Sequence, residues 1–273
     1  MLIDAHQHFW LLKERQGQWP PASLEAIYRD FLPADLEPLL EEAGISGTVL
    51  VQTMESAGDT DFMLALADKN AFIKGVVGWV DMKAADAPAE IARRASHPAF
   101  KGLRPMLQDI ADVEWIEDPA LGPAVETMIE KGLVFDALVL PQHLPYLLRF
   151  ASRHAALQIV IDHGAKPKIA TGHYVAWRRD MAALAALPNV FCKLSGLLVE
   201  RGEQKVEAVR PYAETIFELF GPDRVIFGSD WPVIRLAGDY QGWLDFCRDV
   251  VPQEHHAKVF GANAARIYSL SDR

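Results

Sequence analysis

The chain has 273 residues, of which 50% are hydrophobic and 23% are charged, and its formal net charge is −10. This acidic balance argues against nucleic acid and anionic membranes as partners, because both attract basic patches, and no apolar run is long enough for a transmembrane helix. No signal peptide is visible, since Asp4 and His6 interrupt the N-terminus, and the two cysteines, Cys192 and Cys247, make the cytosol the predicted compartment.

Eight short apolar, β-branched runs recur along the chain, and we predict that each forms a strand. In order they are LIDAH from Leu2, TVLVQT from Thr48, KGVVGWV from Lys74, FKGLRPML from Phe100, LVFDA from Leu133, QIVIDH from Gln158, NVFCKLS from Asn189 and RVIFGSD from Arg224. Helix-periodic stretches lie between most of them, at 33–44, 60–70, 119–132 and 213–221, and several end in glycine, a common helix stop.

Strands that are almost continuously apolar and alternate with helices indicate a parallel sheet covered on both faces. Eight such units predict an α/β fold of the (β/α)8 TIM barrel type, with residues 1–273 forming a single domain. A doubly wound open sheet is the structural alternative. That fold more usually carries a glycine-rich phosphate turn after its first strand, and the G-x-G-x-x-G and Walker A patterns are both absent from the sequence.

The connection from the first to the second predicted strand is far longer than a simple βα loop. It is rich in aromatic residues: Phe9, Trp10, Trp19, Tyr28 and Phe31. Two interpretations are open: a loop folded over the barrel mouth, or a surface loop with its own small core.

Polar residues stand at the same end of successive predicted strands, which core packing alone does not explain because a polar group within an apolar run needs a partner. Active sites of such barrels form at the carboxyl ends of the strands, so these residues are the candidate functional groups. In chain order they are His6, His8, Gln52, Trp79, Asp81, Arg104, Asp136, His163, Lys193, Ser195 and Asp230.

His6 and His8 are two residues apart and therefore point to the same side of a strand. This spacing suits a metal site or a proton-handling site, although it can also arise by chance. Together with His163 and Asp230, the pair offers nitrogen and carboxylate ligands for zinc or a similar ion.

Three of these residues also have purely structural interpretations. His163 could cap its strand, and Asp230 could be the N-cap of the following helix. Arg104 could be the buried ion-pair partner of Asp136.

Several segments, in this order, resemble one family across the whole chain: DAHQHFW, GDTDFMLALA, KGLRPMLQD, VIDHGAKP, CKLSG, FGSDWPV and GANAARIYSL. They are similar to the amidohydrolase superfamily, in the branch that contains sugar lactonases and 2-pyrone-4,6-dicarboxylate lactonases. The resemblance implies hydrolysis of a cyclic ester. The positions that match the superfamily's metal centre are His6, His8, His163 and Asp230.

The resemblance implies one divalent ion, with Zn²⁺ as the first choice, or none, because members of this branch also work without a metal. Binuclear members use a strand-four lysine, whereas Arg104 stands at that strand end here and Lys101 lies at the other. Several sugar lactonases that resemble this chain have histidine directly after the arginine, where this sequence has Pro105. The resemblance therefore does not specify a particular substrate such as fuconolactone.

We hypothesise a hydrolase for a small lactone, with a sugar (aldono-) lactone as the first choice. Asp230 would be the general base, with His163 and Arg104 as its catalytic partners, because imidazole and guanidinium donors can stabilise an oxyanion. Arg104 could instead clamp a substrate carboxylate. The predicted substrate-binding residues are Arg104, Lys193, Asp136, Gln52 and Trp79.

Two other functions are compatible with the same residues. One is another reaction on this scaffold, namely amide or imine hydrolysis or decarboxylation, because one fold hosts many chemistries. The other is a non-catalytic binder of small molecules. The oligomeric state is left open.

Overall fold

The computed structural model describes residues 1–15 and 17–271, and its centre is a sheet of eight parallel strands in sequential order. The strands are β1 (Ile3–Gln7), β2 (Gly47–Val51), β3 (Ile73–Gly78), β4 (Phe100–Leu103), β5 (Val134–Ala137), β6 (Ile159–Ile161), β7 (Val190–Leu194) and β8 (Val225–Phe227). Just beyond β8, the Asp230 N–H donates to the His6 carbonyl at 2.8 Å, and the His8 N–H donates to the Trp231 carbonyl at 2.8 Å. These bonds bring the last strand back to the first, so the predicted TIM barrel is confirmed.

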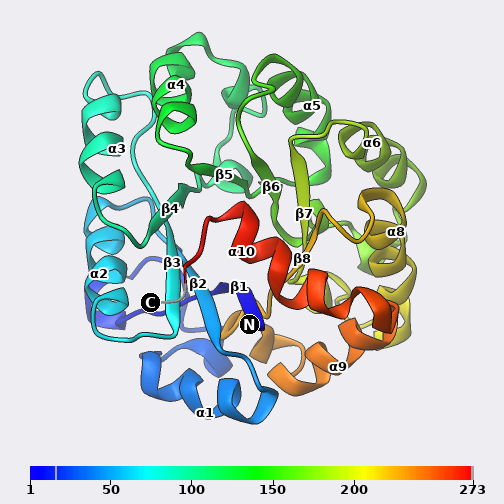
Figure 1. The fold of residues 1–273 in the computed structure, drawn as a ribbon. Helices are drawn as coiled ribbons and strands as arrows, with labels where there is room; N and C mark the ends of the chain where they lie inside the picture. Colours follow the sequence, from blue (N-terminus) through cyan, green and yellow to red (C-terminus); the bar gives the residue numbers. More distant parts are fainter. Residues whose placement is uncertain (16, 272–273) are drawn as a thin grey trace.

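Figure 1 shows helices around the outside of the barrel, with the last of them lying across one end. They are α1 (Pro33–Ala43), α2 (Ala57–Ala67), α3 (Ala87–Ala95), α4 (Gly122–Glu130), α5 (Leu144–Arg153), α6 (Val175–Ala185), α7 (Leu197–Glu200), α8 (Arg210–Phe220), α9 (Tyr240–Val250) and α10 (Asn263–Ile267). The predicted helix at 60–70 begins earlier, because the Ser56 hydroxyl accepts a bond from the Asp59 N–H at 3.3 Å and caps the first turn. None of the helices in the described residues is long and apolar enough to cross a membrane.

The barrel interior is apolar near the strand starts and polar nearer the strand ends. Strand residues such as Val49, Val134 and Phe191 form one buried cluster with residues of the C-terminal segment, including Tyr268. In Figure 1, α10 lies across the barrel beside the N terminus, at the end where the strands begin. The C-terminal segment therefore closes this end of the barrel.

The long connection after β1 combines both interpretations suggested by its sequence. Trp10 and Phe31 form a short antiparallel backbone bridge, and their rings lie 5.3 Å apart between centroids. The same loop delivers Trp19 and Leu24 to the cavity at the strand ends. The connection thus has its own small core and also forms part of the barrel mouth.

Candidate active site

A cavity of about 480 Å³ opens at the carboxyl ends of the strands. Its polar lining consists of His8, Thr53, Arg104, Gln108, Asp109, His163, Lys166 and Asp230. Its apolar lining consists of Trp19, Leu24, Met106, Leu138, Val199, Val233 and Leu236. A cavity that combines apolar walls with a few convergent polar groups is the common form of a small-molecule site.

Three imidazoles converge on one carboxylate oxygen at this cavity, two from its lining and one, His6, from the fully buried interior behind it. The Oδ1 atom of Asp230 lies 3.2 Å from Nε2 of His8, 3.7 Å from Nε2 of His6 and 3.9 Å from Nε2 of His163. All four side chains are buried or nearly so. The structure therefore brings together the four residues that the sequence suggested as a metal centre.

The outer nitrogens of two of these rings are held by neighbouring strands. Nδ1 of His8 donates to the Val51 carbonyl at 2.7 Å, and Nδ1 of His163 lies 2.9 Å from the Ser195 hydroxyl. Such bonds fix the ring orientation, as in histidines that bind metals, and donation by Nδ1 of His8 leaves the lone pair of its Nε2 facing Asp230. Gly196 allows this packing, because a Cβ there would lie 2.4 Å from Nδ1 of His163.

Burial controls the protonation of the cluster. It lowers the pKa of His163 to about 4 and holds the pKa values of His6 and His8 below the usual histidine value. Burial alone would raise the pKa of Asp230, but the adjoining His163 and the close contact with Nε2 of His8 outweigh it and hold that pKa below its usual range. Neutral imidazoles and an ionised carboxylate are the forms that bind a metal.

Arg104 is tied into the barrel by three neighbours. Its Nη1 lies 3.1 Å from Oδ2 of Asp162 and 3.3 Å from Nε2 of His6, and its Nη2 donates to the Gln52 carbonyl. The Gln52 side chain in turn donates to the Arg104 carbonyl at 2.6 Å. The suggested ion pair between Arg104 and Asp136 is therefore wrong, because Asp162 is the carboxylate within reach.

Asp136 pairs instead with Lys193, whose Nζ lies 2.5 Å from Oδ2. The same ammonium group lies 3.0 Å from Oδ1 of Asp162 and 3.1 Å from Nδ1 of His6. The Tyr268 hydroxyl donates to the other oxygen of Asp136 at 2.8 Å. This chain of contacts runs from the C-terminal segment through the barrel interior to the outer nitrogen of His6.

This geometry argues against direct substrate contact for Lys193, Asp136 and Gln52, three of the predicted substrate-binding residues. Each has an exposed fraction of 0%, and none of them lines the cavity within the described part of the chain. The hydrogen bonds of these three residues instead place them behind the group formed by the three histidines and Asp230. Trp79 is half-buried and also lies outside the described lining, whereas Arg104 belongs to it.

Sequence reasoning missed several lining residues and one central carboxylate. Thr53 and Lys166 stand just after the polar strand ends Gln52 and His163, so a wider window after each strand would have included them. Asp162 directly precedes His163 in VIDHG but is not among the site residues predicted from the sequence. Apolar lining such as Leu236 carries no comparable signal, because the sequence does not distinguish it from core residues.

Comparison with known proteins identifies the family. A family model described as Amidohydrolase matches residues 3–270, and the chain belongs to this family. An L-fucono-1,5-lactonase of Burkholderia ambifaria is 52% identical, over 98% of this chain and 95% of that protein. An L-fucono-1,5-lactonase of Burkholderia multivorans is 32% identical, over 99% and 96%. A crystal structure of an amidohydrolase from Burkholderia multivorans with bound zinc superposes with a TM-score of 0.92 at 33% identity, covering 99% of this chain and 100% of that chain.

Proposed function

We propose that this protein hydrolyses the cyclic ester of a sugar lactone, and that L-fucono-1,5-lactone or a close relative is its substrate. The 52% identity to a lactonase of that name, over almost the full length of both chains, supports the substrate class. Several similar sugar lactonases have histidine directly after the arginine, where this chain has Pro105. The proposal therefore names the class of sugar lactones first and the particular lactone second.

The observation that carries the proposed mechanism is the placement of the Asp230 carboxylate. It is ionised, buried with an exposed fraction of 5%, and directed into the cavity beside His8 and His163. In this position it can take a proton from a water molecule that attacks the lactone carbonyl, and then return the proton to the leaving alkoxide. Arg104 lies at the edge of the same cluster, where its guanidinium can stabilise the developing negative charge on oxygen.

The donor set fits one divalent ion, with Zn²⁺ as the first choice, because neutral nitrogens and a carboxylate converge there and two rings are oriented by outer bonds. His6, His8, His163 and Asp230 would hold it. When bound, such an ion lowers the pKa of a coordinated water and polarises a carbonyl. Because an alkoxide leaves more readily than an amine, Asp230, Arg104 and the imidazoles would also serve lactone opening without an ion.

The proposal is tested by measuring proton release with a pH indicator, using a panel of aldonolactones together with a pyrone dicarboxylate. Wild type is compared with Asp230→Asn, and thermal unfolding checks that the variant is folded. We expect turnover of a sugar lactone, reduced about 10²–10⁴-fold in the variant, which is the usual contribution of a general base. If the folded wild type releases no protons from any lactone of the panel, the result would contradict the proposal and favour amide hydrolysis or decarboxylation.

The cytosolic location also remains a proposal. It is supported by the two cysteines, Cys192 and Cys247, which are both buried free thiols.

A further inference from the structure

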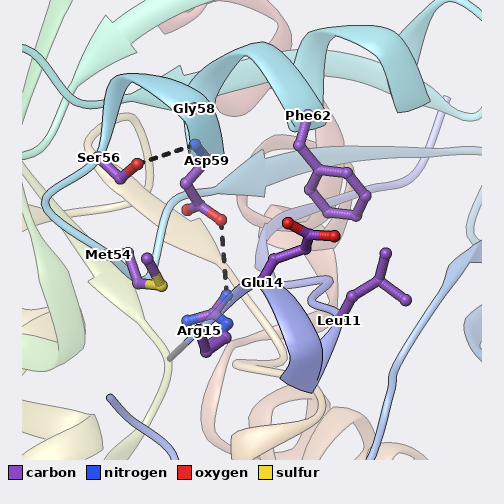
Figure 2. A pocket seen from close by; sticks show the side chains of 8 residues that line it. All are labelled: Leu11, Glu14, Arg15, Met54, Ser56, Gly58, Asp59 and Phe62. Atoms are coloured by element: carbon purple, nitrogen blue, oxygen red, sulfur yellow. Dashed lines mark hydrogen bonds and ion pairs between the residues drawn. The ribbon is translucent and has the colours of Figure 1, made fainter. Parts of the chain in front are cut away.

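A second cavity, of about 290 Å³, lies between the loop after β1 and the start of α2. Figure 2 shows Arg15 on one side of it, directed toward Asp59 of α2. The exposed fraction of Arg15 is 2%, and its Nη2 lies 3.6 Å from Oδ1 of Asp59. A guanidinium that is buried to this degree needs specific partners.

The other contacts of Arg15 connect this second cavity with the substrate cavity. Its Nη2 donates to the Thr53 hydroxyl at 2.5 Å, and its Nη1 donates to the Trp19 carbonyl at 3.2 Å. Thr53 and Trp19 both line the substrate cavity. Asp59 also accepts a bond from the Thr53 N–H at 3.3 Å. The ion pair therefore supports Thr53 from behind, through both its side chain and its backbone.

This arrangement determines what the Thr53 hydroxyl can offer to a ligand. A hydroxyl group has one proton to donate and two lone pairs to accept with, and Arg15 occupies one lone pair. Across residues 1–15 and 17–271, no protein acceptor takes the Thr53 proton. Donation by the guanidinium also polarises the O–H bond and makes it a better donor.

We infer that Thr53 binds substrate by donating a hydrogen bond to one hydroxyl oxygen of the lactone, and that Arg15, held by Asp59, is the positioning residue for this donor. The inference rests on the proposed function and adds a determinant of specificity to it. A site built to bond a particular hydroxyl discriminates against the analogue that lacks it, because the buried polar group is then left unpaired.

The first test uses Thr53→Val, which keeps the shape of the side chain, and Thr53→Ser, which keeps the hydroxyl. We expect kcat/KM for the best lactone to fall about tenfold in Thr53→Val, mainly through KM, and to stay within about twofold in Thr53→Ser. Lactones with one hydroxyl at a time replaced by hydrogen identify the contact. For one of these analogues we expect wild type to have a kcat/KM about tenfold lower than for the best lactone. For that analogue, Thr53→Val is expected to have the same kcat/KM as wild type.

The second test concerns the positioning role. Arg15→Met is expected to lower kcat/KM about fivefold in wild type but less than twofold in the Thr53→Val background, since the two residues act through one hydrogen bond. Asp59→Asn, which keeps the shape of the side chain, is expected to show the same pattern if Arg15→Met does not fold.

These outcomes separate the inference from the proposed function. Equal losses for every lactone in Thr53→Val would make Thr53 a structural support and overturn the inference. Unchanged kinetics would overturn it as well. A folded wild type that turns over no lactone would instead overturn the proposed function and, with it, this inference.

Discussion

Asp230 and His163 share an uncommon backbone conformation. Their φ angles are 58° and 53°, in the left-handed region that residues with a Cβ rarely adopt. Strain of this kind persists only where the surrounding structure enforces it, as the bond from the Asp230 N–H to the His6 carbonyl does here. Both residues lie at the point where the imidazoles meet the carboxylate, so the strained backbone positions these two side chains.

The packing of His163 predicts a sharp effect at Gly196. In Gly196→Ala the new Cβ would collide with the imidazole, whereas Gly172→Ala has nothing within 4 Å and a similar φ of 69°. Each change is expected to cost about 1–2 kcal/mol in free energy of unfolding, because alanine is unfavourable at positive φ, and the collision with His163 adds to this cost in Gly196→Ala. Only Gly196→Ala is expected to lower lactone turnover, by about 100-fold, through the displaced ring. Comparable turnover in the two variants would show that His163 tolerates displacement.

The lowered histidine pKa values predict the acid limb of the pH profile. Because burial holds the pKa of His163 at about 4, its imidazole stays neutral down to that pH, and kcat/KM should lose half its value near pH 4. An unperturbed histidine would place this midpoint near 6.5. Stopped assays after brief exposure to each pH separate this titration from unfolding, and a midpoint above pH 6 would contradict the burial argument.

At the scale of elements, the barrel and many strand-end groups could be predicted, but the depth of each group could not. Alternation along a strand shows that His6 and His8 face one side. It does not show that Lys193, inside β7, and Asp136, inside β5, lie below the cavity floor. Their depth depends on the stagger between neighbouring strands, which closes the barrel and leaves no mark in the sequence of one strand. Sequence alone therefore could not show that Lys193 and Asp136 are fully buried and lie outside the described lining of the cavity.

The C-terminal segment predicts an effect of Tyr268 on stability. Removing its hydroxyl in Tyr268→Phe leaves one oxygen of the buried Asp136 without its donor, so we expect a loss of about 1.5–3 kcal/mol in free energy of unfolding. Tyr212→Phe is the matched control, because its side chain is also buried but, within the part of the chain that the structure describes, its hydroxyl makes no bond to Asp136. Urea unfolding of both variants measures the difference, and equal losses would mean that the bond to Asp136 carries no special weight.

At the scale of the whole molecule, binding of a metal ion by the barrel should increase the free energy of unfolding. If Zn²⁺ binds the folded chain alone, a free concentration 100 times its dissociation constant adds about 2.7 kcal/mol to the free energy of unfolding. We expect zinc to raise the Tm of wild type and a chelator to reverse the rise. His8→Ala, which removes one donor beside Asp230, should show a much smaller shift. An unchanged Tm in wild type would favour catalysis by the side chains alone.

Met1 and Gly261 lie against each other at the closed end of the barrel, and this has a consequence for synthesis. The carbonyl of Met1 lies so close to Gly261 that a Cβ there would approach it to 2.2 Å. A chain emerging from the ribosome makes residues in order, at about 5–20 per second, so β1 is made long before β8 and Tyr268, which complete the barrel around it. Until Tyr268 is made, Asp136 lacks the hydroxyl donor that the folded barrel gives it. During synthesis the incomplete barrel is therefore an open sheet with exposed strand edges. We expect its folding yield to depend more on chaperones that shield such edges than the yield of an equally long protein made of local β-hairpins.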